Sequence, residues 1–343
     1  MNIPKHAIIT AFISKTKDRF HEYNTFKTFE ERLQMAASLQ GFTGVEIIYP
    51  YEISDSTMCI ELLKKYRLNV AAVNVNIKAE PEFRHGGLTS NNIEIRQKAI
   101  LFIKQAKDFA KAIGANKVTC CPLGDGYEFN FNCDYSKMWN YLIETLEEAA
   151  SYLPEIPLFI EYKPSETRGH CFVDRGAKAL CLLNDIGVKA MGITLDYGHS
   201  KYGGDNPAEI LSLLANSAFP YYIHINDNNS AWDWDYMVAS SNYLAYIEFL
   251  YYLKKFQYTD FLTSDTSPTR WDIKGTFEAN SRLTNKIWAL LSQIDMTEFD
   301  KLITQGDFLK TWQFIEVNLL KLREPADYVS YECTTTNLQR DTA

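Results

Sequence analysis

The sequence predicts an α/β protein, a (β/α)8 TIM barrel with a C-terminal helical extension, and three observations lead to this fold class. Short apolar runs of strand length alternate eight times with segments of helical periodicity. No long low-complexity linker interrupts the alternation, which favours a closed barrel over an open doubly wound sheet. The sequence also lacks the glycine-rich dinucleotide fingerprint and the phosphate-loop pattern that accompany many open sheets.

The eight predicted strands are the apolar runs at 7–12, 44–49, 70–75, 117–121, 158–162, 192–195, 221–225 and 258–263. The predicted helices lie at 29–39, 57–66, 93–113, 138–152, 177–183, 208–214, 243–256 and 277–291. Gly41 and Gly114 follow predicted helices, as residues that end a helix do. Asp55 and Asp174 suit helix N-caps, and Pro207 suits a first helical turn.

The chain continues beyond the eighth strand–helix unit. Residues 298–322 carry apolar side chains at helical spacing, which predicts one or two more helices that pack on the barrel or on a partner subunit. We therefore expect a catalytic barrel domain at 1–295, a helical extension at 296–330 and a polar tail at 331–343.

Composition and charge limit the classes of partner. Hydrophobic residues make up 46% of the chain, enough for a large core, and charged residues 23%, as in ordinary soluble proteins. The net charge of −8 argues against nucleic acid, because phosphate binding needs a basic face. It is compatible with a neutral small molecule and a metal ion. No apolar run reaches the ~20 residues of a membrane helix, so we expect no membrane partner.

The seven cysteines are scattered and form no C-x-x-C pair. An odd, unpatterned set favours reduced thiols over a disulfide framework. The N-terminal segment lacks the apolar core of a signal peptide. These features together predict a cytoplasmic protein.

Polar side chains of metal-ligand type end four consecutive predicted strands. Glu161 ends the fifth strand, Asp196 the sixth, His224 the seventh and Asp265 the eighth. The carboxyl ends of barrel strands form one face, so these side chains are expected to converge there. Three carboxylates and one imidazole suit Mg²⁺, Mn²⁺ or Co²⁺ better than a thiolate-rich zinc site. Any one of them has a structural alternative, since a lone Asp after a strand is often an N-cap.

A second predicted ligand set lies beside the first. His199 is three residues beyond Asp196, and Asp233 and Asp235 follow the seventh strand in a Trp-rich loop. Asp196 has two oxygens and can bridge a first cation, bound with Glu161, His224 and Asp265, to a second. We therefore expect two divalent cations, Mn²⁺, Co²⁺ or Mg²⁺.

The segment that ends the fifth strand carries a family resemblance. It reads Glu161-Tyr162-Lys163-Pro164-Ser165-Glu166-Thr167-Arg168-Gly169 and is similar to the E-x-K-P-x-E-x-R-G signature of the xylose isomerase superfamily. The ligand order over residues 161–265 resembles the L-rhamnose isomerase branch. Weaker support comes from His85-Gly86-Gly87-Leu88-Thr89-Ser90 and Arg96, which resemble a segment of the wider sugar isomerase and epimerase barrels.

The resemblance implies a metal-dependent aldose–ketose isomerase that acts on an open-chain sugar by a hydride shift between C1 and C2. It gives Lys163 a catalytic role, a hydrogen bond from its ammonium group to the sugar carbonyl oxygen, although an ion pair with Glu161 or Glu166 is the structural alternative. The Phe-His-Asp motif of xylose isomerases has no counterpart, since the second strand ends in Tyr49-Pro50-Tyr51-Glu52. Sugar ring opening is therefore unassigned, with His85 as the nearby candidate.

Four residues are candidate substrate contacts. Asn74 lies at the end of the third predicted strand, and His85 is the nearby histidine in the segment 85–90. Trp232 and Trp234 flank Asp233, where their rings suit the apolar face of a sugar. As alternatives, Asn74 can form hydrogen bonds with backbone groups of the loop, and the two tryptophans can serve in packing. Asn226, just past His224, is a candidate support for the ligands.

Three other functions compete with the isomerase. A ketose 3-epimerase uses the same barrel with a single divalent metal, and it needs neither Lys163, His199 nor the Asp233/Asp235 pair. An apurinic endonuclease needs a histidine-rich zinc cluster and a basic face, which six histidines and a charge of −8 argue against. A non-enzymatic sugar-binding member is expected to have lost ligands. A homodimer or homotetramer is expected, because such barrels usually associate and the C-terminal helices can dock across an interface.

Overall fold

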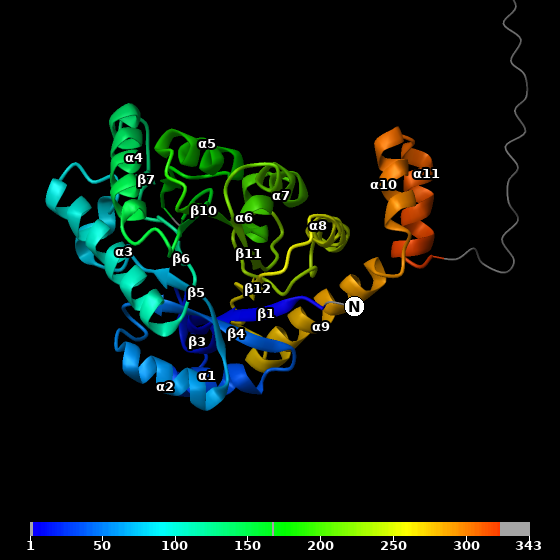
Figure 1. Ribbon diagram of the computed structural model, residues 1–343, viewed down its shortest axis with the longest axis horizontal. Coiled ribbons are helices and arrows are strands. Elements are labelled where there is room, and N and C mark those ends of the chain that lie inside the picture. Colours follow the sequence, from blue (N-terminus) through cyan, green and yellow to red (C-terminus); the bar gives the residue numbers. More distant parts are fainter. Residues whose placement is uncertain (1–2, 167, 323–343) are drawn as a thin grey trace, which may run out of the picture. The chain divides into compact units, whose positions relative to one another are not determined.

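A closed barrel of eight parallel strands forms the centre of the protein, as the sequence predicts (Figure 1). The computed structural model describes residues 3–166 and 168–322. In their order around the barrel, the strands are β1 (Lys5–Ile9), β12 (Phe261–Ser264), β11 (Tyr221–Ile225), β10 (Met191–Asp196), β8 (Leu158–Glu161), β6 (Val118–Cys120), β5 (Asn69–Val75) and β4 (Phe42–Tyr49).

Helices surround the strands (Figure 1). They are α1 (Phe29–Ser38), α2 (Ser56–Tyr66), α3 (Ile93–Ile113), α4 (Tyr135–Ser151), α5 (Gly176–Ile186), α6 (Tyr197–Gly203), α7 (Pro207–Ala215), α8 (Tyr243–Lys255) and α9 (Ile273–Leu291). All eight predicted helices are present. Helix α6 was not predicted, because its seven residues are too few to show an apolar period.

Most of the helix-boundary predictions are confirmed. Asp55 caps α2 by accepting from the Met58 amide, Gly114 ends α3 in the left-handed conformation, and Pro207 opens α7. The prediction for Asp174 is wrong, because the N-cap of α5 is Arg175.

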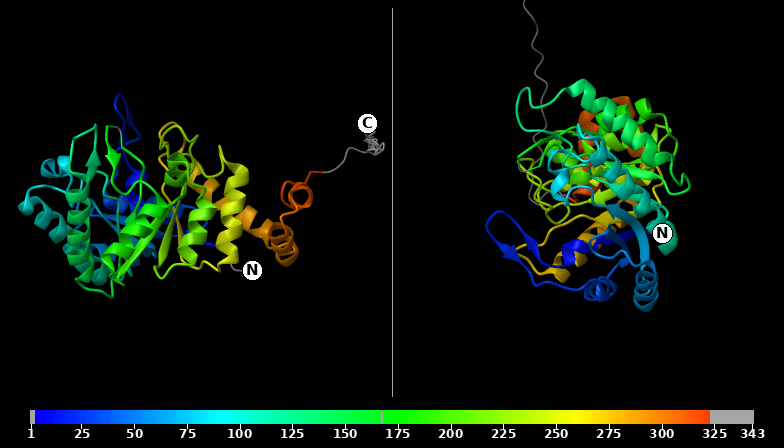
Figure 2. Two further views of the ribbon diagram at one scale, coloured as in Figure 1. Left: turned by 90° about the horizontal axis from the view of Figure 1, so that it is seen from above. Right: turned by 90° about the vertical axis from the view of Figure 1, so that its left-hand side faces the viewer.

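Short elements at the carboxyl ends of the barrel strands escaped prediction. The predicted strand at 7–12 ends early, because Thr10–Ile13 forms a 3-10 turn. Strands β2 (Thr16–Lys17) and β3 (Glu22–Tyr23) form a hairpin, and β7 (Gly126–Tyr127) pairs with the distant β9 (His170–Cys171) in a second two-stranded sheet. A 3-10 helix, η2 (Pro81–His85), follows β5. Two-residue strands are too short to show alternation. Figure 2 shows the β2–β3 hairpin, in dark blue, standing out from the barrel body.

Aromatic rings fill the barrel interior where glycines leave room for them. Phe159 and Tyr222 are buried there with Phe261 packed against them. A Cβ at Gly44 would lie 2.6 Å from the Phe261 ring, and one at Gly192 would lie 2.5 Å from the Phe159 ring. Glycine is therefore needed at both positions for the rings to pack.

The chain divides into two compact units, 1–288 and 289–343. The second contains the predicted helices, here α10 (Met296–Gln305), α11 (Phe308–Phe314) and the π-helical turn η3 (Ile315–Leu319). The rings of Phe299 and Phe314 stack with centroids 4.7 Å apart. The division falls seven residues before the predicted boundary at 295, which stays a prediction. The predicted tail at 331–343 lies outside the described residues.

Two sequence expectations concern the whole chain. Within the described ranges, none of the helices combines the length and apolar character needed to cross a membrane. Six cysteines of the described part carry free thiols, and Cys333 lies beyond it.

Candidate metal centre

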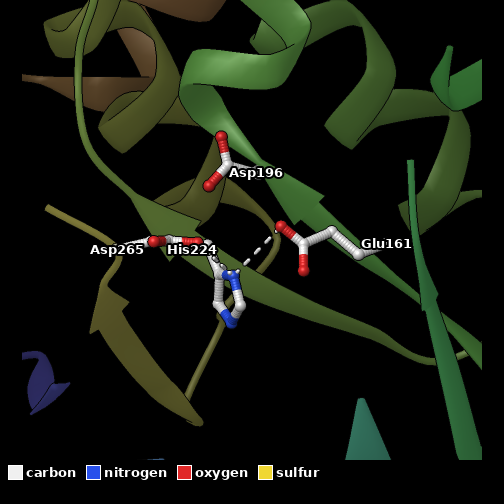
Figure 3. Close-up of side chains that lie close together, drawn as sticks. All are labelled: Glu161, Asp196, His224 and Asp265. Carbon is white, nitrogen blue, oxygen red and sulfur yellow. Dashed lines mark ion pairs between the residues drawn. The ribbon is translucent and has the colours of Figure 1, made fainter. Parts of the chain in front are cut away.

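Four side chains from the carboxyl ends of neighbouring strands meet in one buried cluster (Figure 3). Its members, here called the first set, are Glu161, Asp196, His224 and Asp265, and their ligand atoms all lie within 4.8 Å of one another. The strand register explains the convergence. Asp196 pairs with His224 across β10 and β11, and Glu161 pairs with Thr194, two residues before Asp196 on the same face.

The imidazole of His224 faces two of the carboxylates. Its Nδ1 atom lies 3.4 Å from Glu161 Oε1 and 3.3 Å from Asp265 Oδ2 (dashed lines in Figure 3). Nδ1 is buried, and neither contact has hydrogen-bond geometry. A buried ring nitrogen that faces carboxylates without a hydrogen bond is well placed to share a cation with them.

Buried negative charge dominates the electrostatics of the first set. Burial raises the pKa of Asp196 to about 7, and the charges of Asp265 and Glu161 add to this rise. Burial also raises the pKa of Asp265. At Glu161 burial acts in the same direction, but the attraction of His224 and His199 outweighs it and lowers the pKa to about 2. Three carboxylates thus face one imidazole within the first set, and these oxygen-rich donors fit a divalent cation.

The remaining predicted ligands are His199, Asp233 and Asp235, here called the second set, to which the bridging Asp196 of the first set was also assigned. An ion pair between His199 and Glu161 joins the second set to the first. Nδ1 of His199 lies 3.3 Å from Glu161 Oε1, and Nε2 lies 3.3 Å from Asp233 Oδ2. Oδ1 of Asp233 is buried without a hydrogen-bond partner. Asn226 donates to Asp196 at 3.0 Å and to Asp235 at 3.4 Å, which links the two sets as its position suggested.

Helix α6 sets the position of His199. The Asp196 carboxylate accepts a hydrogen bond from the His199 backbone amide at 2.7 Å, which makes it the N-cap of α6. An N-cap and a ligand role for Asp196 are therefore compatible, since the carboxylate has a second oxygen.

Lys163 points into the second set. Its Nζ atom lies 2.9 Å from Asp233 Oδ2 and 2.5 Å from Glu166 Oε1. Burial lowers the pKa of Lys163, but the attraction of Asp233 and Glu166 outweighs burial and raises it well above the ordinary value. The side chain is therefore an ammonium group at neutral pH, held beside the ligands by two carboxylates.

The four predicted substrate contacts occupy different surroundings. Trp232 packs edge-on against Tyr202, with ring centroids 5.3 Å apart, and Trp234 is 47% exposed. His85 ends the 3-10 helix after β5 and is exposed, whereas Asn74 is buried and donates to Glu46 at 3.0 Å. Their predicted contact with a sugar stays a prediction.

The segment around Thr89 has a structural role in the loops of this face. The buried Asp125 carboxylate accepts hydrogen bonds from the Thr89 amide and hydroxyl, each at 2.7 Å. Arg96 donates to the Ser90 carbonyl at 2.6 Å and lies over the Tyr141 ring. These contacts tie the loop after β5 to the loop after β6.

Sequence reasoning missed Glu46, a fully buried residue of β4 whose Oε2 lies 3.0 Å from His224 Nε2. A signal was present, because Glu46 is the one charged residue in the predicted strand at 44–49. A carboxylate inside an apolar run must have a buried partner.

Comparison with known proteins places this site in a family. Residues 33–284 match the family described as xylose isomerase-like TIM barrel. The chain belongs to this family. The match covers most of the chain and includes every residue of the first and second sets. The family part of the sequence prediction is thereby confirmed, and the rhamnose isomerase branch stays a prediction.

Curated relatives match part of the chain. A xylose isomerase from Thermus thermophilus is 23% identical over 184 residues, 52% of this chain and 48% of that protein. A xylose isomerase from Bacillus sp. (strain LW2) is 29% identical over 136 residues, 38% of this chain and 31% of that protein. The matched part of the chain thus spans about half or less of the length of these relatives.

A solved structure of similar fold is a D-tagatose 3-epimerase-like protein, with a TM-score of 0.65 and 20% identity, covering 84% of this chain and 98% of that one. An L-ribulose 3-epimerase has a TM-score of 0.66 and 14% identity over 85% of this chain and 96% of its own. At these identities the likeness concerns the fold.

Proposed function

We propose that the protein is a metal-dependent sugar isomerase that interconverts an aldose and its ketose by a hydride shift between C1 and C2. The observation that carries the proposal is the buried first set, with the Lys163 ammonium in the adjoining second set. Xylose isomerases among the relatives agree with this activity.

In this proposal the first set holds one divalent cation, and Asp196, His199, Asp233 and Asp235 hold another. Bound Mn²⁺, Co²⁺ or Mg²⁺ supplies Lewis-acid polarisation of the sugar oxygens. Asn226 keeps Asp196 and Asp235 in place through its two donor contacts.

Lys163 acts on the substrate carbonyl in this proposal. Its ammonium group donates a hydrogen bond to the oxygen on which negative charge develops during the hydride shift. Asp233 and Glu166 leave the amine protonated and restrict its position. Trp232 and Trp234 provide an apolar wall for one sugar face.

A ketose 3-epimerase with a single cation is the second candidate. Two observations favour it. Only the first set, among the described residues, gathers its ligand atoms within 4.8 Å, and solved 3-epimerases share the fold. Two buried carboxylates of the first set, Glu161 and Asp265, would then exchange the C3 proton as acid and base. Lys163 and the second set favour the isomerase, because an epimerase does not need them.

The deciding experiment assays a panel of aldoses and ketoses in D2O with EDTA-treated protein to which Mn²⁺, Co²⁺ or Mg²⁺ is restored. A hydride shift gives aldose–ketose exchange without deuterium on carbon. Epimerisation by proton exchange inverts C3 and incorporates deuterium there. An Asp265→Asn variant serves as the control for contaminating activity. Absence of metal-restored turnover on any sugar would contradict both candidates.

We also propose that the protein is a cytoplasmic homodimer or homotetramer without a nucleic-acid or membrane partner. The charge of −8 supports the part of this proposal that concerns nucleic acid. Light scattering after size-exclusion chromatography tests the oligomeric state.

A further inference from the structure

Glu46 contacts the edge of the His224 imidazole ring that points away from the first set. Its Oε2 atom lies 3.0 Å from His224 Nε2, and both side chains are 0% exposed. The contact joins β4 to β11 through the barrel interior. His224 thus has a carboxylate on Nε2 and the ligand cluster on Nδ1.

Two further strands fix the Glu46 carboxylate itself. Asn74 of β5 donates to Oε1 at 3.0 Å, and Thr119 of β6 donates to the same oxygen at 2.8 Å. Asn74 is 8% exposed and Thr119 is 0% exposed. Oε1 is therefore occupied by two donors, and Oε2 is left for the imidazole.

This arrangement dictates which nitrogen of His224 carries a proton. An ionised carboxylate only accepts hydrogen bonds, so Nε2 must donate to Glu46. In the neutral imidazole Nδ1 is then unprotonated, and its lone pair faces Glu161 and Asp265. Metal-ligating histidines in many proteins are oriented by a carboxylate in this way.

We propose that Glu46 is the positioning residue of the metal centre: it holds His224 in the tautomer that presents Nδ1 to the cation. The inference rests on the proposed function in one respect, that the first set binds a divalent cation. A merely structural Glu46, present to satisfy Asn74 and Thr119, would affect folding without a specific effect on metal affinity.

The test is Mn²⁺ binding by Glu46→Gln, measured by isothermal titration calorimetry on the full chain. Asn74 and Thr119 keep the amide oxygen on their side, which turns the amide NH2 group toward His224 Nε2. Nε2 must then accept, the proton moves to Nδ1, and the ring loses its ligand lone pair. We expect a 10- to 100-fold weaker Kd, the range found when such supporting residues are lost.

Glu52→Gln is the matched control. Glu52, in the turn after β4, is also a nearly buried carboxylate, but it is held by Arg32 and accepts from the Ile48 amide. The same chemical change there should leave the Mn²⁺ Kd within about 3-fold. Thr119→Val removes one donor to Glu46 without touching the ligands, and we expect about a 2- to 10-fold weaker Kd, as for the loss of one hydrogen bond. This variant keeps the inference testable if Glu46→Gln does not fold.

Nitrogen-15 NMR of the histidine side chains in Zn²⁺-loaded protein shows which ring nitrogen of His224 carries the proton. A Glu46 that served only the fold would leave this protonation pattern unchanged on substitution. His224, assigned with a His224→Gln variant, should carry its proton on Nε2 in the wild type and lose this pattern in Glu46→Gln. Wild-type-like Mn²⁺ affinity in both Glu46→Gln and Thr119→Val would overturn the role of Glu46 while leaving the proposed function intact. A wild type that binds no cation would overturn both.

Discussion

The two ligand sets sit side by side at the carboxyl end of the barrel, yet they differ in how their charge is compensated. In the first set, carboxylates surround one imidazole nitrogen that has no hydrogen bond. In the second, Asp233 contacts both the Lys163 ammonium and the His199 ring. The protein therefore supplies a lysine ammonium to the second set, whereas within the first set only the His224 imidazole can carry positive charge, and it must lose its proton to bind metal. The first set depends more on a cation from solution.

This difference implies an order of metal affinity. A cation that enters the second set competes with Lys163 for Asp233, whereas one that enters the first set mainly displaces protons. We infer that the first set binds more tightly, and the variants below test that order from the largest expected effect to the smallest.

Loss of a first-set carboxylate should have the largest effect. Glu161→Gln removes one negative ligand from the first set and also the partner of both His224 and His199. We expect metal-restored activity to disappear and the tighter Mn²⁺ Kd to weaken by more than about 100-fold, beyond the loss for a supporting residue. Calorimetry and the sugar assay check this. Full activity with unchanged Mn²⁺ affinity would remove Glu161 from the centre.

Lys163→Met should separate catalysis from binding. We expect kcat to fall by about 10²- to 10³-fold, as for loss of a donor to a developing oxyanion. Metal should still bind, and the second cation should bind more tightly because Asp233 is released. The matched control is Lys117→Met, because Lys117 is buried but bonds to the Ala71 carbonyl and pairs with Asp260. Unchanged kcat in Lys163→Met would exclude the catalytic role.

Asp233→Ala should abolish cation binding at the second set and leave binding at the first set. We expect a wild-type titration with two Mn²⁺ per chain to become one with a single Mn²⁺. The tighter Kd should change by less than about 5-fold, because the ion pairs of Asp233 are with Lys163 and His199 and it acts on the first-set side chains through His199. Simultaneous loss of both cations would contradict the two-set description. A wild type that binds one Mn²⁺ would favour the epimerase.

The convergence of the first-set side chains was predictable from the sequence because the fold makes distant strand ends adjacent. Asp196 and His224 are 28 positions apart in number, but parallel register pairs them directly. Eight alternating strand–helix units predict a barrel, and the carboxyl ends of all barrel strands lie on one face. These two inferences were enough to predict that the first-set side chains lie together.

The partner of Glu46 and the spatial placement of the predicted residue His199 are what the sequence pattern could not supply. Recognition of the Glu46 contact with His224 needs the position of β4 relative to β11 around the barrel, which the period of a single strand does not contain. The His199 position depends on α6, which begins at an Asp196 cap and has too few residues for an apolar period. Contacts across the barrel interior and the positions of short capped helices depend on the tertiary structure, which local sequence patterns do not describe.

The pH dependence of Mn²⁺ affinity tests the first set without any substitution. Metal requires ionised carboxylates and an unprotonated ring nitrogen. Because the pKa of Asp196 is raised to about 7, its carboxyl group is protonated below that pH and Mn²⁺ affinity should fall.

The imidazoles act in the same direction as Asp196. Burial lowers the pKa of His224, but the attraction of Glu46 and Glu161 outweighs it and raises the pKa well above the ordinary value, so binding must also release this proton. We expect the affinity to fall by about tenfold or more per pH unit from pH 7 to pH 5.5. Calorimetry in buffers of different ionisation enthalpy measures the protons released. A pH-independent Kd over this range would mean that cations bind away from the first set.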